Sequence, residues 1–285
     1  SGFGAGTGAS AAAGLGAGLG WFAGVALRIR RRVVDENLQT AFPELSRSRR
    51  NRIARGCYMH FGSVGALMMR LYDRPRAVWA QWFDSIEGVD HLRGSETAPC
   101  GVLYTGHFGC WELIPSAIIT HGLRICSVAK PVHNPNLEQL IRYFRAGEGM
   151  QIVSTDESMR RMVKLNREGW VMAMVADQDA RKKGVFVDFL GKPASTATGP
   201  ALFSIRLGAS LCPTFCYRLP NGKFRVEVEP PLTPLSGVSM EEAIADLTAR
   251  QTQRLEARIR AFPEQYWWLH RRWKTRPPTE KKNRP

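Results

Sequence analysis

The chain has 285 residues, of which 44% are hydrophobic and 23% charged, and its 40 Lys and Arg against 25 Asp and Glu give a formal net charge of +15. This composition excludes a disordered tail and a small disulfide-stabilised scaffold. A length in this range suits one large α/β domain or two small domains. The positive charge favours a polyanionic partner: nucleic acid, anionic lipid headgroups or a very acidic protein.

Residues 1–27 contain no charged side chain and are mostly Gly and Ala. The chain begins with Ser rather than Met, which suggests a processed or trimmed product. The run approaches the roughly 20 residues needed to cross a bilayer, although Gly and Ala make it weakly hydrophobic. Trp21 lies near its end, and the cationic cluster at 28–32 follows directly. We therefore expect a marginal membrane-associated segment over 1–27, with a flexible Gly/Ala linker as the alternative.

Apolar residues recur at steps of three and four over 49–71, which predicts an amphipathic helix. Packing of this stripe against the main domain is the expected arrangement. Leu67 and Met69 fall beside the stripe and could, with the arginines of the first turns, rest on lipid. The stripe consists of Ile53, Cys57, Phe61, Val64, Met68 and Leu71.

Short apolar runs then alternate with helical stretches, which predicts βαβ units. We expect an α/β fold: a mixed, mostly parallel sheet flanked by helices, in one domain over 28–277, followed by a basic tail at 278–285. The expected strands are 101–105, 125–129, 152–153, 170–176, 211–217 and 224–228. The expected helices are 112–121, 135–146, 157–168, 200–207 and 240–261.

The strand at 101–105 runs into a turn that carries His107, and Glu112 follows in or near the first helical turn. Ligands of open α/β sheets bind at the carboxyl ends of the strands. A carboxylate that holds one ring nitrogen as N–H leaves the other free to accept a proton. Gly106 and Gly109 allow the tight turn that this arrangement needs. The alternative is that His107 is a structural hydrogen bonder.

No convincing protein nucleophile lies nearby, because Cys110 is inside the turn and the chain has no G-x-S-x-G motif. The histidine base would then activate a hydroxyl of the acceptor directly. Without a P-loop or a G-x-G-x-x-G after a strand, a nucleotide cofactor is not expected. Six scattered cysteines without a C-x-x-C pair argue against a zinc or redox site and fit small buried residues, so we expect no metal and no cofactor.

A second polar cluster follows the strand at 170–176 and contains Asp177, Gln178, Asp179 and Arg181. It lies at the end of a strand, on the edge where His107 is expected, so the two clusters are predicted to converge. An ordinary solvated turn is the alternative.

Five stretches in order along the chain resemble the lipid A biosynthesis acyltransferase family, the late lauroyl and myristoyl transferases. The His-x4-acid motif of 105–112 and the Trp/His/Arg run of 263–277 are the most specific. The matching stretches are 37–44, 105–112, 176–179, 185–191 with 193–194, and 263–277.

The resemblance implies a glycerol-phosphate-acyltransferase-like fold and transfer of a fatty acyl group from acyl carrier protein to a hydroxyl of an anionic lipid acceptor, a lipid A precursor. The place implied is the cytoplasmic face of the bacterial inner membrane. By the family's motif, His107 is the general base and Glu112 its orienting carboxylate, with no acyl-enzyme. The residues that this resemblance assigns to substrate binding are Lys130, where the family often has Arg, and Asp177, Gln178, Asp179 and Arg181.

Three other hypotheses remain open. A relative could acylate another lipid, such as a phosphoinositol mannoside or an ornithine lipid, or take its acyl group from acyl-CoA. A non-catalytic protein could keep the fold and bind anionic lipid. The Trp267, Trp268 and Trp273 group between cations could stack on bases, but we expect it to pack the fold and expect no nucleic-acid partner.

Overall fold

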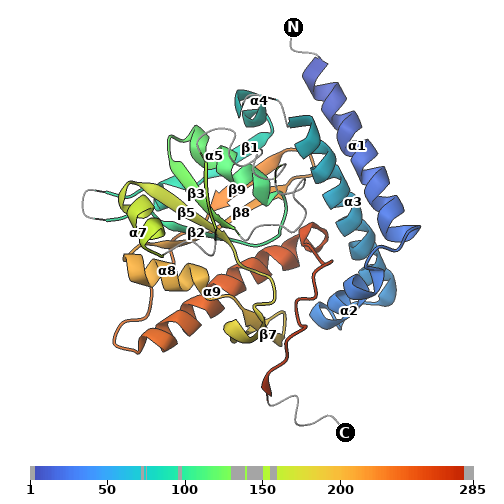
Figure 1. Ribbon diagram of the computed structural model, residues 1–285. Helices are drawn as coiled ribbons and strands as arrows, with labels where there is room; N and C mark the ends of the chain where they lie inside the picture. The colour runs from blue at the N-terminus through green and yellow to red at the C-terminus, as the bar shows by residue number, and fades with distance from the viewer. Residues whose placement is uncertain are drawn as a thin grey trace.

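The computed structural model describes residues 4–71, 74, 76–95, 98–129, 139, 150–154 and 159–278. A seven-stranded sheet with the order β1-β9-β8-β2-β5-β3-β4 forms its centre (Figure 1). β8 and β9 pair antiparallel and the other neighbours pair parallel, so the prediction of a mixed, mostly parallel sheet is confirmed. The strands are β1 (Phe83–Glu87), β2 (Val102–Thr105), β3 (Arg124–Ala129), β4 (Gln151–Ser154), β5 (Trp170–Val175), β8 (Leu211–Arg218) and β9 (Phe224–Val228).

Helices cover both faces of this sheet because its strands carry apolar side chains on both sides. In β2, Val102 and Tyr104 join one core cluster, together with side chains of α7, α8 and α9. Leu103 faces the other cluster, which α5 and the C-terminal half of α3 complete. The helices are α1 (Gly4–Val25), α2 (Arg31–Ala41), α3 (Arg47–Leu71), α4 (Arg76–Ala80), α5 (Ile114–Thr120), α7 (Met159–Arg167), α8 (Gly199–Leu207) and α9 (Met240–Ala261), with short 3-10 helices at Val89–Leu92, Trp111–Leu113, Arg181–Lys183 and Pro263–Gln265.

The predicted boundaries agree closely for α3, α7, α8, α9 and the strands β2, β3, β5, β8 and β9. The helix expected at 112–121 begins instead as a 3-10 turn and becomes α5 at Ile114, just before Pro115. The helix expected at 135–146 lies outside the described residues, apart from position 139.

The separate hairpin of β6 (Val185–Phe189) and β7 (Lys192–Thr196) was not expected. Its turn places Leu190 at φ 53° and Gly191 at φ 80°, as a type I′ turn requires. Leucine is a poor residue for the first of these positions, so the usual Asn-Gly or Asp-Gly signal is missing.

The Gly/Ala-rich segment forms α1, which packs along α3 (Figure 1). A Cβ atom on Gly20 would lie 2.0 Å from the Tyr58 carbonyl oxygen, and one on Gly16 would lie 2.3 Å from that of Gly62. Small residues therefore let two helix backbones approach closely, and the flexible-linker alternative is wrong. In the described part of the chain no single helix is long and apolar enough to cross a membrane; 11–26 and 31–41 pass that test only as a pair, bent by 90°.

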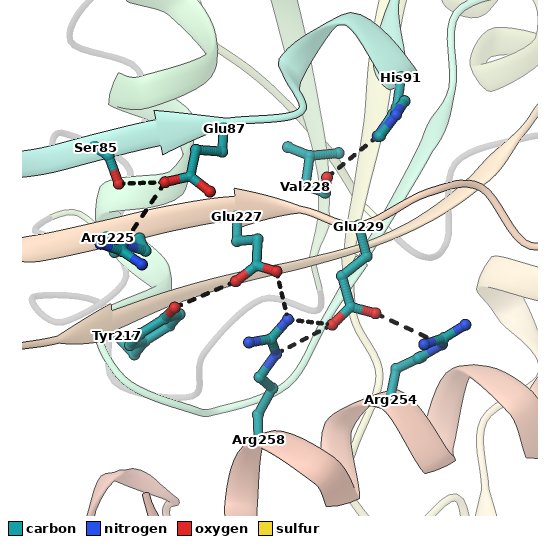
Figure 2. Close-up of polar contacts among 10 residues, drawn as sticks. All are labelled: Ser85, Glu87, His91, Tyr217, Arg225, Glu227, Val228, Glu229, Arg254 and Arg258. Carbon is teal, nitrogen blue, oxygen red and sulfur yellow. Dashed lines mark hydrogen bonds and ion pairs between the residues drawn. The ribbon is translucent and has the colours of Figure 1, made fainter. Parts of the chain in front are cut away.

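Ion pairs tie α9 to the sheet (Figure 2). Arg258 of α9 donates to Glu227 of β9 at 2.7 Å and to Glu229 at 2.6 Å and 3.0 Å. Its guanidinium also lies over the rings of Phe215 and Tyr217. We call the set Arg258, Glu227 and Glu229 the Arg258 cluster. It fixes the long closing helix against the antiparallel side of the sheet, and the chain following that helix reaches the site described next.

Candidate active site

The pairing of β2 with β5 brings His107 and Asp177 together. Thr105 and Val175 are register partners at the ends of these parallel strands, so the residues two positions further along lie side by side. His107 Nδ1 donates to Asp177 Oδ1 at 2.6 Å, and the His107 backbone N–H donates to Oδ2 at 3.0 Å. The carboxylate is 2% exposed and the imidazole 25% exposed. The two polar clusters therefore converge as predicted.

The carboxylate that accepts the hydrogen bond from His107 Nδ1 belongs to Asp177, whereas the sequence spacing favoured Glu112. That prediction is corrected because residue 177 comes from the neighbouring strand at the same level, whereas Glu112 belongs to the following 3-10 turn. Glu112 Oε1 accepts a hydrogen bond from the Trp111 indole at 2.9 Å, and the Trp111 ring meets the His107 ring edge-on with centroids 4.9 Å apart. Glu112 thus contacts a neighbour of the histidine, and its part in the reaction stays a prediction.

Asp177 is held in its charged form although it is buried. Burial alone would raise the pKa of this carboxyl group. The charge of His107, the two hydrogen bonds from that residue and the charge of Arg272 outweigh burial, so that the pKa of Asp177 is lowered below its ordinary value. Burial and then the nearby Asp177 carboxylate raise the pKa of Tyr266 well above its ordinary value, which keeps that phenol neutral. An ionised Asp177 favours the proton on Nδ1 and stabilises a positively charged imidazole.

The turn that carries His107 is held by residues 263–276, which we call the C-terminal strap. Gly109 N–H donates to the Gln265 carbonyl oxygen at 2.7 Å, and Trp267 N–H donates to that of His107 at 2.9 Å. Gly109 has φ 60°, and a Cβ atom there would lie 1.8 Å from the Cys216 carbonyl oxygen. Only glycine fits this position, as the predicted tight turn requires.

Two polar residues in turn fix the strap. Asn37 of α2 donates from Nδ2 to the carbonyl oxygens of Trp268 (2.8 Å) and His270 (2.6 Å). Arg272, 1% exposed, donates from Nη1 to the Ser195 carbonyl oxygen at 2.7 Å and lies over the Phe189 ring. The strap therefore connects α2, the β6–β7 hairpin and the His107 turn.

The thiols offer no nucleophile at this site. All six cysteines are unbridged and buried, which confirms the prediction that they are small core residues. Burial raises the pKa of Cys110 far above its ordinary value, so this thiol stays protonated. Among the described residues, no group of three or more His, Cys, Asp or Glu side chains could hold a metal ion.

A basic cavity of about 1870 Å³ is lined by Gln178, the residue that follows Asp177, but by neither member of the histidine–aspartate pair. Gln178, Asp179 and Arg181 line it, so three of the predicted substrate-binding residues share one surface, whereas Asp177 is committed to His107. Lys130 lies outside the described residues. The cavity's cations are Arg30, Arg32, Arg181, Lys182, Lys183, Lys192, Arg271, Lys274 and Arg276, and its carboxylates are Glu36 and Asp179.

Sequence reasoning missed how Asp177, Arg272 and Asn37 act. Asp177 was assigned to substrate, although its place two residues beyond β5 mirrors that of His107 beyond β2. Arg272 and Asn37 lie far from the turn in the sequence, and only the fold brings them to the strap. The one signal in the sequence that could have pointed to Arg272 and Asn37 was that they lie in two of the family-like stretches, 263–277 and 37–44.

The fold and this geometry define an α/β protein with a histidine–carboxylate pair at the carboxyl edge of its sheet, beside a basic cavity. The family model described as bacterial lipid A biosynthesis acyltransferase matches residues 5–275. The chain belongs to this family, and it is a lipid acyltransferase.

Several named relatives share the sequence over most of the chain. The lipid A biosynthesis lauroyltransferase of Escherichia coli K12 is 31% identical over 88% of this chain and 81% of its own length. The palmitoleoyltransferase of the same organism is 26% identical over the same shares. The phosphatidylinositol mannoside acyltransferase of Mycobacterium tuberculosis CDC 1551 is 28% identical over 66% of this chain and 59% of its own length.

Proposed function

We propose that this acyltransferase moves a fatty acyl group from acyl carrier protein to a hydroxyl of a lipid A precursor at the cytoplasmic face of the bacterial inner membrane. The observation that carries the proposal is the His107–Asp177 pair, a partly exposed imidazole on a buried carboxylate. The lauroyltransferase and palmitoleoyltransferase relatives support the acceptor class.

In this mechanism His107 Nδ1 keeps its proton on Asp177, and Nε2 accepts the proton of the acceptor hydroxyl. The oxygen attacks the thioester carbonyl, so that a C–O bond forms and the carbonyl oxygen becomes an oxyanion. When the oxyanion collapses, the C–S bond breaks, and the leaving thiolate takes the proton from His107. Asp177 stabilises the imidazolium between these two steps. Because Cys110 is buried and protonated, no acyl-enzyme on that thiol is invoked.

The membrane location has support from an apolar surface on α1. Leu15 and Leu19 are 69% and 62% exposed, and Trp21 and Phe22 are also exposed. On α3 Met69 is exposed, whereas Leu67 is buried in the core. Arg28, Arg30 and Arg32 follow the apolar surface, as suits anionic headgroups. Phe22→Ser should weaken co-sedimentation with phosphatidylethanolamine–phosphatidylglycerol vesicles, whereas the exposed Leu235→Ser should not; equal binding would contradict this location.

The reaction is tested by acyl transfer from labelled acyl carrier protein to a tetraacylated lipid A precursor in detergent micelles. His107→Ala should lower the rate by roughly 10²–10⁴-fold. The matched control is His121→Ala, an exposed histidine at the end of α5. A folded His107→Ala protein with full activity would refute the role of the base.

A second acceptor class has one supporting observation, the relative that acylates phosphatidylinositol mannoside. An assay with four combinations distinguishes the acceptors and the donors. Each acceptor, phosphatidylinositol mannoside or the lipid A precursor, is offered once with labelled acyl carrier protein and once with acyl-CoA. Product with phosphatidylinositol mannoside and none with the lipid A precursor would reassign the acceptor.

A further inference from the structure

Trp111 contacts both His107 and Glu112. Its indole N–H donates to Glu112 Oε1 at 2.9 Å, and its ring meets the His107 imidazole at an interplanar angle of 68°, with the ring centroids 4.9 Å apart. Trp111 and Glu112 are half-buried, whereas the imidazole is 25% exposed. The acid of the His-x4-acid motif is therefore connected to the histidine through the tryptophan that precedes it.

The hydrogen bond to Asp177 does not by itself fix the plane of the His107 ring. It holds Nδ1 at 2.6 Å from the carboxylate oxygen. The χ2 torsion of histidine has broad energy minima, so one hydrogen bond at Nδ1 leaves the ring free to tilt. A tilt moves Nε2, the atom that accepts the hydroxyl proton in the proposed mechanism. A misplacement of about 1 Å can lower a rate by about 10²-fold.

Trp111 is well supported on the side away from the imidazole. The backbone N–H of Cys110 donates to the Cys216 carbonyl oxygen at 2.9 Å, which ties the 3-10 turn to β8. The indole packs against the core cluster that α5 and the C-terminal half of α3 complete, and the Phe61 ring of α3 lies 6.0 Å from it, centroid to centroid. The hydrogen bond to Glu112 selects one orientation of the indole, because turning the ring over would take its N–H away from that oxygen.

We propose that Trp111 is a positioning residue, which holds the His107 ring in the plane where Nε2 faces the acceptor hydroxyl, and that Glu112 acts through Trp111 by fixing the indole. The inference rests on the proposed function and deepens it, because it assigns how the acid of the motif serves the base. Asp177 already occupies Nδ1, so a second carboxylate is not needed there. The reaction then requires of Glu112 a hydrogen-bond acceptor and not a negative charge.

Steady-state acyl transfer distinguishes an acceptor from a charge at residue 112. Glu112→Gln keeps an oxygen for the indole N–H, although a neutral one, and should lower kcat by about threefold. Glu112→Ala and Trp111→Phe should each lower kcat by about 10–100-fold, with KM nearly unchanged. The double variant should be no worse than either single variant, because the two residues act through one contact. Trp82→Phe is the control, a half-buried tryptophan next to β1, which lies three places from β2 in the sheet.

The order of the His107 ring can be measured without turnover. In protein labelled with 13C-histidine and held in detergent micelles, the Cε1–H signal of His107 is assigned by its loss in His107→Ala. The order parameter from 13C relaxation should fall in Glu112→Ala and in Trp111→Phe. It should stay near the wild-type value in Glu112→Gln, which rescues the contact.

Three results would overturn the inference. They are an unchanged order parameter or full activity in Trp111→Phe, equal losses of kcat in Glu112→Gln and Glu112→Ala, and additive losses in the double variant. The second of these would show that the reaction needs the negative charge of Glu112. If the wild type transfers no acyl group but the order of the His107 ring falls as expected, the proposed function fails and the positioning of His107 by Trp111 stands.

Discussion

Arg258 and Arg272 are both arginines that lie over aromatic rings, but their partners differ. Arg258 meets carboxylates directly, at 2.6 Å and 2.7 Å. Arg272 donates to the neutral oxygens of Ser195 and Thr196, and its Nε has no partner among the described residues. The nearby carboxylate, Asp177, uses both its oxygens for His107. An arginine that is paired directly with carboxylates mainly stabilises the fold. The positive charge of Arg272, by contrast, acts on the His107–Asp177 pair.

The largest expected effect comes from breaking the His107–Asp177 pair, for which we propose the catalytic role. Asp177→Asn keeps the shape but replaces the charge that selects the Nδ1–H tautomer and stabilises the imidazolium. We expect kcat to fall about 10³-fold with little change in KM. Steady-state acyl transfer measures this, with Asp90→Asn, an exposed carboxylate 89% accessible at its side chain, as control. An unimpaired Asp177→Asn enzyme would return the orienting role to Glu112.

Substitutions in the Arg258 cluster should lower the stability of the fold and leave the rate of acyl transfer unchanged. Arg258→Met leaves Glu229, which is 8% exposed, without its nearest cation. We expect the free energy of unfolding to fall by about 2 kcal/mol, less than for a fully buried pair because part of the arginine is exposed. Urea denaturation measures this, and kcat of the remaining folded enzyme should be unchanged.

Arg254→Met is the matched control for that variant. Arg254 contacts the same Glu229 at 3.6 Å, but its side chain is 53% exposed, so its loss should cost below about 1 kcal/mol. Similar losses for the two variants would mean that burial does not distinguish the two ion pairs.

His60 is a buried ionisable group outside both arginine sites. Its Nε2–H donates to the Gly109 carbonyl oxygen at 3.0 Å, and burial lowers the pKa of His60 to about 4. The unfolded chain binds this proton near pH 6.5, so the stabilisation is complete above about pH 6.5 and is lost as the pH falls toward 4. When the pH is lowered from 7 to 5, protonation of His60 in the unfolded chain should lower the free energy of unfolding by about 2 kcal/mol.

Urea denaturation at the two pH values, for wild type and His60→Gln, isolates that contribution. The variant should lose about 2 kcal/mol less than the wild type on acidification, because glutamine keeps a donor but does not titrate. The half-buried His270, whose pKa is also lowered to about 4, titrates in both proteins and cancels in the comparison. An identical loss in both would show that His60 is charged in the folded state.

The sequence predicted the sheet well because its apolar runs and their spacing are local properties. β9 and α9 appear within the expected bounds, and the convergence of His107 with Asp177 follows from two strands that end at one edge. That Asp177 is the direct partner of His107 could not be predicted, because this contact depends on the register between β2 and β5, which local sequence patterns do not determine. The sequence showed the glycines of α1, but only the packing on α3 shows that they permit close helix contact.

Arg272 gives the smallest and most specific effect. Arg272→Met removes a buried positive charge near His107 and Asp177. Without the repulsion from that charge, protonation of the His107 imidazole becomes more favourable. The acid limb of kcat/KM should therefore move to higher pH, by roughly 0.5–1 unit, since general-base catalysis needs the neutral ring. Arg272→Lys keeps the charge and should leave the limb in place even if the lost hydrogen bond to Ser195 lowers Tm. Arg258→Met should not move the limb at all. If Arg272→Met loses stability while its pH profile stays unchanged, then Arg272 is as purely structural as Arg258, and the distinction between the two arginines disappears.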